Sequence, residues 1–232
     1  MEKPIVHQSA ETAGSNLGPS SLSSQLSAAL TRDSQSGAAT QAGRWTPGPA
    51  ALKETLVAHS CRRLTSLCEA VGFDRAAVRR ATNALIELMS GWGDLPVGET
   101  DGWVSDIADD NSPIEFSLAV SDSGPEIRMM LEALGGPSMS DQRRAALELT
   151  RRIAAFPEVD LGRFWRIADL FLPEAYLGGK FALWHSVCFS PTENPHFKAY
   201  FNPQARGAGM AQALVQAALQ ELGFPQAWTL LE

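Results

Sequence analysis

The feature that most restricts the fold is the alternation of apolar and polar residues in two separate hairpin-like stretches. In the first, "SPIEFSLAVS" is followed by the turn "DSGP" and then by "EIRMMLEAL". In the second, the strand-like "KFALWHSVCFS" is followed by the turn "PTENP" and then by "HFKAYFNP". Successive side chains of a strand point to opposite faces of its sheet, so both stretches predict β-hairpins with one apolar and one polar face.

Segments with helical spacing of apolar residues flank both hairpins. The predicted helices cover residues 50–72, 75–92, about 140–156, 160–173 and 207–223. Asp74 is a suitable N-cap for the second helix, and Gly223 is a suitable end for the last one. The chain therefore has the order α-ββ-α twice, which predicts an α+β fold. Its antiparallel sheet would be covered by helices on its apolar face.

The N-terminal residues differ in composition from the rest. Residues 1–47 are rich in Ser, Ala, Gly and Gln and have little to bury, which predicts a disordered low-complexity tail. Residues 48–232 then form one domain, with a loop rich in Gly and Asp over 93–111. We further expect Phe164 and Trp165 to pack in the core, together with the strand residue His185.

Charge and hydropathy exclude several classes of protein. The net charge of −7 argues against a nucleic-acid-binding surface, which would favour a basic patch. No apolar run approaches the roughly 20 residues of a membrane span, and "MEKPIVHQ" lacks the apolar region of a signal peptide. The three cysteines do not suggest a disulfide framework. We therefore expect a cytoplasmic protein.

The polar faces of both hairpins carry side chains that can do chemistry. They are Glu115, Ser117, Arg128 and Glu132 in the first hairpin, and Lys198 and Tyr200 in the second. One interpretation is an ordinary solvated sheet face. The other is that the sheet curls into a barrel with helices outside, so that these groups converge on one polar chamber.

The same residues resemble those of aromatic prenyltransferases of the dimethylallyltryptophan synthase type, the ABBA-barrel enzymes. In that family a Glu lies on the first strand, and an Arg opens the second strand four residues before another Glu. A Lys-x-Tyr pair lies on a later strand, before a Pro. The resemblance covers roughly residues 50–232, and the matching positions are Glu115, Arg128, Glu132, Lys198, Tyr200 and Pro203.

The resemblance implies transfer of a dimethylallyl group from its diphosphate to an aromatic acceptor, indole or tryptophan-derived, in secondary metabolism. Arg128 and Lys198 would bind the diphosphate, and Tyr200 would shield the allylic cation with its π face. Glu115 would bind the indole N–H and help to remove a proton. No cofactor or metal is implied, because "ADDNS" at 108–112 is only superficially similar to an Asp-rich magnesium motif.

The chain departs from the family in the number of its units. Closing the family barrel takes about five αββα units, whereas this sequence supplies two. The expected partner is therefore a complementary half-barrel chain or a second copy of this chain. A truncated gene product, a fragment and one half of a split enzyme all remain open. In each case we expect the chain to be inactive, or nearly so, on its own.

Two other functions remain as alternatives. The segment "QARGAG" at 204–209 fits the pyrophosphate-binding loop of GNAT acyltransferases, which use acetyl-CoA. However, that fold needs further strands after the following helix, and it leaves the first hairpin unexplained. The second alternative is a non-catalytic interaction module derived from a barrel.

Overall fold

The structure is a computed structural model that describes residues 54–100, 102–121 and 124–230. The predicted low-complexity tail over 1–47 lies outside the described residues, so the domain boundary at residue 48 stays a prediction. The element order after residue 53 is two helices, two strands, two helices, two strands and a final helix. This order confirms the predicted repetition of α-ββ-α.

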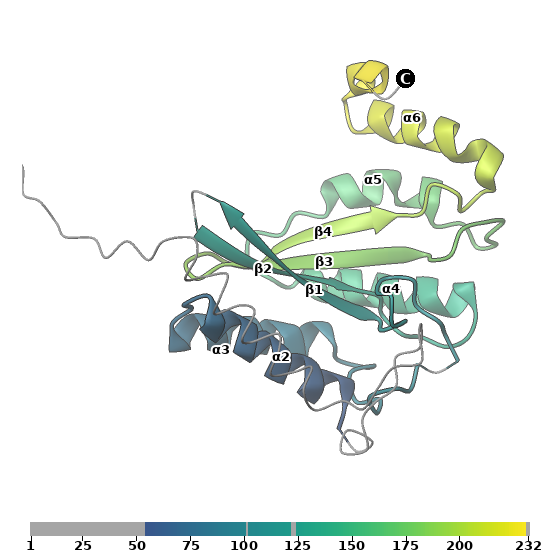
Figure 1. Cartoon of the computed structure of the whole chain (residues 1–232). Coiled ribbons are helices and arrows are strands. Elements are labelled where there is room, and N and C mark those ends of the chain that lie inside the picture. The colour runs from purple at the N-terminus through teal and green to yellow at the C-terminus, as the bar shows by residue number, and fades with distance from the viewer. Residues whose placement is uncertain (1–53, 101, 122–123, 231–232) are drawn as a thin grey trace, which may run out of the picture.

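The four strands form one antiparallel sheet in the order β1-β2-β3-β4. Their bounds are β1 Ile114–Ser121, β2 Gly124–Leu131, β3 Leu183–Phe189 and β4 His196–Phe201. Each predicted hairpin therefore exists, and β2 and β3 join the two hairpins into a continuous sheet. β1 and β4 lie at the two edges (Figure 1).

Five α-helices in the described part of the chain pack against this sheet or against one another. They are α2 Leu56–Ala70, α3 Arg75–Leu88, α4 Met139–Ile153, α5 Gly162–Phe171 and α6 Ala211–Glu221, with 3-10 turns η1 Ala208–Met210 and η2 Pro225–Leu230. Figure 1 shows α2 and α3 beside β1 and β2, while α5 and α6 lie near β3 and β4. No helix in the described ranges is long and apolar enough to cross a membrane.

Local sequence accounts for the helix ends. The Asp74 side chain accepts a hydrogen bond from the Ala77 N–H at 2.7 Å, which is the predicted N-cap of α3. Gly223 follows α6 with φ +83°, a left-handed conformation that suits glycine at the end of a helix. The start of α3 and the end of α6 therefore lie where the capping residues predicted them.

The main core lies between the helices and one face of the sheet. Ile127, Met129 and Val187 are fully buried there against residues of α2, α3 and α4. A smaller cluster joins Phe164 of α5 to Leu183 and Phe201. The apolar face of the alternating pattern is therefore the helix-covered face, as predicted.

Trp165 corrects one part of this expectation. Phe164 is buried, but Trp165 is 46% exposed. Adjacent residues of a helix point about 100° apart, so only one of the two can face the sheet. Buried residues Phe164, Ile167, Ala168 and Phe171 mark that face of α5.

Candidate active site

The register of the sheet places all four predicted site residues on the face opposite the helices. Glu115, Met130, Ser186 and Lys198 form one cross-strand row. Ser117, Arg128, Cys188 and His196 form the next row, and Trp184 pairs with Tyr200 beside Lys198. We refer to this side of the sheet as the polar face. Glu115, Lys198 and Tyr200 are exposed on it.

Arg128 is held in place by a carboxylate on its own strand. Its guanidinium lies 3.0 Å from Glu126, two residues earlier on the same face of β2. The Glu126 hydrogen bond raises the pKa of Arg128, so the guanidinium stays charged. A planar guanidinium in this position can donate N–H hydrogen bonds to the oxygens of a phosphate.

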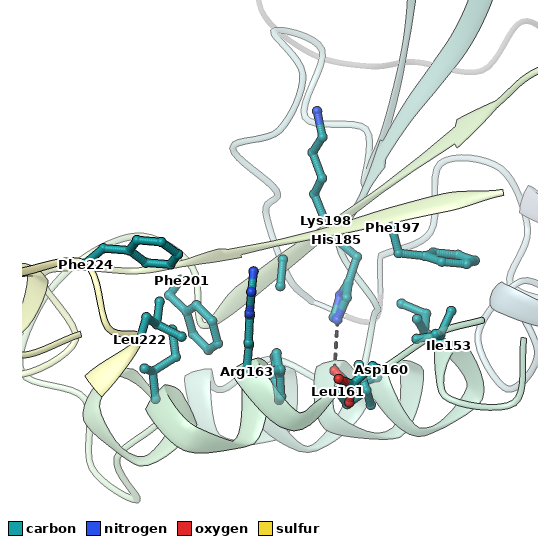
Figure 2. A pocket seen from close by; sticks show the side chains of 15 residues that line it. Ile153, Asp160, Leu161, Arg163, His185, Phe197, Lys198, Phe201, Leu222 and Phe224 are labelled. Atoms are coloured by element: carbon teal, nitrogen blue, oxygen red, sulfur yellow. Dashed lines mark hydrogen bonds between the residues drawn. The ribbon is translucent and has the colours of Figure 1, made fainter. Parts of the chain in front are cut away.

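Lys198 and Tyr200 lie two residues apart on the edge strand β4. Figure 2 shows Lys198 projecting from β4 on the side opposite to His185 and Phe201, which point towards the helices. Lys198 lies one strand beyond Ser186, and Tyr200 lies beside Trp184 of β3. Glu115, on the other edge strand, is three strand spacings from Lys198, or roughly 14 Å along the sheet. The face thus carries a carboxylate at one edge and a cation and a phenol at the other.

Glu132 differs from its prediction. Glu132 lies four residues after Arg128 and so on the same side of the sheet, as expected, but its side chain is only 1% exposed. The Ser105 hydroxyl donates a 2.7 Å hydrogen bond to it, and burial raises its pKa. The segment around Ser105 therefore covers this end of the polar face, so Glu132 does not belong to the exposed set.

A separate apolar cavity lies on the helix side of the sheet. It has a volume of about 330 Å³ and is lined by His185, Phe197, Phe201, Leu222 and Phe224, among others (Figure 2). The His185 imidazole lies 2.9 Å from the Thr150 hydroxyl and is fully buried, which lowers its pKa to about 3. This confirms the prediction that His185 is a packing residue. Lys198 is among the residues that line this cavity, but its side chain projects from the other side of β4 (Figure 2), so the cavity is not the site of the polar face.

The described ranges contain no group of three or more His, Cys, Asp or Glu side chains that could hold a metal ion. The "ADDNS" segment is a loop in the structure, as predicted, and its Asp110 side chain accepts a hydrogen bond from the Ser112 N–H. The charged groups available on the polar face are therefore side-chain cations and carboxylates.

Comparison with known proteins establishes the family. The family model described as tryptophan dimethylallyltransferase matches residues 61–231. The chain belongs to this family.

Solved structures of similar proteins agree. The 5-dimethylallyl tryptophan synthase from Streptomyces coelicolor, solved with DMASPP and Trp, is 30% identical with a TM-score of 0.68, over 75% of this chain and 49% of that chain. Prenyltransferase PriB is 31% identical with a TM-score of 0.67, over 75% of this chain and 50% of that chain. The 6-dimethylallyltryptophan synthase from Micromonospora olivasterospora is 31% identical with a TM-score of 0.64, over 74% of this chain and 48% of that chain.

The chain spans about half the length of these solved relatives. The fold is therefore a partial ABBA barrel, as the repeated units predicted. No curated protein matches the chain.

The structure gives the "QARGAG" segment a role other than binding acetyl-CoA. The Arg206 guanidinium donates to the carbonyls of Asp169 and Leu170, at 2.7 and 2.9 Å, and so caps the C-terminal end of α5. Gly207, with φ +95°, makes the turn into η1. The family match and these contacts leave the acyltransferase alternative without support.

Two residues of this face were missed by sequence reasoning. Trp184 lies on the polar face next to Tyr200, and Glu126 pairs with Arg128. The signal for Trp184 was present, because His185 was placed on the apolar face and its neighbour must then face the other way. The signal for Glu126 was its i, i+2 spacing from Arg128.

Proposed function

We propose that this protein contributes one half of an aromatic prenyltransferase. The complete assembly would transfer a dimethylallyl group from its diphosphate to the indole ring of tryptophan or a tryptophan derivative. The observation that supports this is the common face of Glu115, Arg128, Lys198 and Tyr200. Relatives of about 30% identity that were solved with DMASPP and Trp support the substrate classes.

The reaction divides among these residues by charge. Arg128 and Lys198 bind the diphosphate, and their charges stabilise it as the C1–O bond breaks and the electron pair leaves with the phosphate oxygen. The π face of Tyr200 lies beside the allylic cation. Glu115 accepts a hydrogen bond from the indole N–H, which makes the ring more nucleophilic, and assists loss of the ring proton after attack. Side-chain cations supply the charge that a metal would otherwise supply, so we propose a metal-independent reaction.

The proposed partner is a complementary half-barrel chain or a second copy of this chain. Among the described residues, β1 and β4 are the edge strands, and no helix or strand covers the part of the polar face that carries Glu115, Lys198 and Tyr200. An allylic cation on such a face would meet water before it met an acceptor. We therefore expect catalysis only where further αββα units enclose this face.

A binding experiment on the 232-residue chain tests the function. Dimethylallyl thiodiphosphate and coenzyme A are titrated separately by calorimetry in the presence of EDTA. We expect saturable binding of the thiodiphosphate only, and loss of that binding in Arg128→Gln. Arg144→Gln is the matched control, because Arg144 also pairs with a carboxylate but lies on α4.

The opposite preference, for coenzyme A, would overturn the proposal. A third outcome is that the chain binds neither ligand and that its stable native assembly transfers no prenyl group. This result would favour the alternative of a non-catalytic interaction module.

A further inference from the structure

Glu132 is a buried carboxylate at one end of the polar face. It follows β2 with the same parity as Arg128 and Met130, and it is 1% exposed. The Ser105 hydroxyl donates to it at 2.7 Å. A carboxylate this deeply buried is costly unless donors satisfy it, so its surroundings show what holds it there.

The donors around this carboxylate are neutral: one makes a hydrogen bond to it, and two are indole N–H groups close by. Besides Ser105, the indole N–H groups of Trp103 and Trp184 face it and oppose the rise in its pKa that burial causes. Both indole nitrogens and Glu132 Oε1 are buried and have no hydrogen-bond partner within the described ranges. Glu132 is therefore the polar group that lies nearest to both unpaired indole N–H groups.

No ion pair to a cation is seen for Glu132 among the described residues. The nearby acid Asp106 raises the pKa of Glu132 further, and Asp106 itself pairs with Lys180 at 2.7 Å. A carboxylate whose donors are all neutral can fix the direction of each donor group, but no cation balances its charge. This arrangement orients the donor side chains and is not a salt bridge.

The two tryptophans come from different parts of the chain and both lie near Glu132, while Trp184 also lies beside Tyr200. Trp184 is the cross-strand neighbour of Tyr200, and Phe181 stacks on its ring at 3.9 Å between centroids. Trp103 belongs to the loop before β1, which Ser105 anchors by accepting from the Ile107 N–H while donating to Glu132. Glu132 thus joins this loop to the aromatic end of the polar face.

From this geometry we propose that Glu132 is a positioning residue. It holds Trp103 and Trp184 as a closed aromatic wall next to Tyr200, and this wall keeps water from the prenyl cation. The inference rests on the proposed function. When the C1–O bond breaks, indole carbon normally attacks the cation. If the wall opens, a water oxygen attacks instead, loses a proton to solvent, and gives dimethylallyl alcohol.

The first test needs no activity. Indole N–H signals of the 232-residue chain are followed by ¹H–¹⁵N NMR from pH 4 to pH 8 and assigned with Trp103→Phe and Trp184→Phe. We expect both signals to titrate together, with a midpoint above the ordinary pKa of a glutamate, and to stop titrating in Glu132→Gln. Indole signals that ignore pH, or that titrate equally in Glu132→Gln, would overturn the proposed contact.

The second test uses the complete assembly and measures the ratio of dimethylallyl alcohol to prenylated indole. We expect Glu132→Leu to raise this ratio by about fivefold or more, while Glu132→Gln, which keeps an acceptor, stays within about twofold of wild type. Glu148→Leu, an exposed carboxylate on α4, is the control. An unchanged ratio in folded Glu132→Leu would overturn the proposal.

Ser105→Ala provides a second variant if Glu132→Leu does not fold. It removes one donor and releases the loop, so we expect a smaller rise in the same ratio, and no rise would count against the proposal. Wild type that forms neither alcohol nor prenylated product would instead refute the proposed function. The NMR test would then still decide whether Glu132 holds the two indoles.

Discussion

At the scale of single residues, the two cations and the carboxylate of the proposed site lie on different strands of the polar face. Arg128 and Lys198 lie on β2 and β4, whereas Glu115 lies at the far edge on β1. In the proposed reaction the cations contact the prenyl diphosphate, and the carboxylate contacts the acceptor. Substitutions on the two sides should therefore affect different steps.

Lys198→Ala should weaken binding of dimethylallyl thiodiphosphate by roughly 1.5–3 kcal/mol, the value of one hydrogen bond to a charged group. Glu115→Gln should leave that binding nearly unchanged and slow the single-turnover chemical step in the complete assembly, because the carboxylate acts on the indole. Calorimetry and rapid-quench kinetics measure the two effects. Equal turnover by Glu115→Gln would refute the role given to that carboxylate.

His185 makes stability depend on pH. Burial lowers its pKa to about 3, so at mildly acidic pH the unfolded chain binds a proton that the folded chain excludes. Its contribution is complete above the unfolded pKa of about 6.5 and is lost as pH falls below it. Between pH 7.5 and 5 we expect wild type to lose about 2 kcal/mol more of unfolding free energy than His185→Leu.

Urea unfolding at the two pH values measures this difference. His196→Leu is the control, because His196 is exposed on β4 and this substitution should leave the acid loss in place. If wild type and His185→Leu lose the same stability, the buried neutral imidazole would be ruled out.

At the scale of elements, alternation and capping residues predicted most of the structure. The strand parity of Glu115, Arg128, Lys198 and Tyr200 followed from period 2 alone. The burial of Glu132 could not be predicted, because the residues that cover it lie in the loop over 93–111, which has no periodic signal. Local patterns place a residue on a face, but tertiary contacts decide whether that face is open.

The start of α4 provides a test at this scale. Ser138 and Asp141 form a capping box, in which the Asp141 N–H donates to the Ser138 hydroxyl oxygen at 3.1 Å. Ser138→Ala should lower the free energy of unfolding by 0.5–2 kcal/mol, usually about 1. Ser140→Ala, an exposed change within the same helix, should have a much smaller effect in the same urea measurement. Equal losses would show that the cap contributes nothing specific.

At the scale of the whole molecule, the repeated α-ββ-α order was enough to predict the class of fold. The sequence could not show how the two hairpins join, because pairing of β2 with β3 depends on residues about 60 positions apart. Nor could it show the cavity beside β4, which arises from the packing of α4, α5 and the residues that follow α6 against the sheet. The arrangement between units is therefore what the structure adds.

The order of the strands in the sheet is also their order along the chain. Each strand after β1 pairs with one that has already been synthesised, so once β1 and β2 have paired, no strand has to wait for a later segment before it forms hydrogen bonds. The sheet can grow in one direction during translation, with the newest strand always as its edge. In such a growth process the polar face is laid down strand by strand, Arg128 before Lys198, while the polypeptide is still being made.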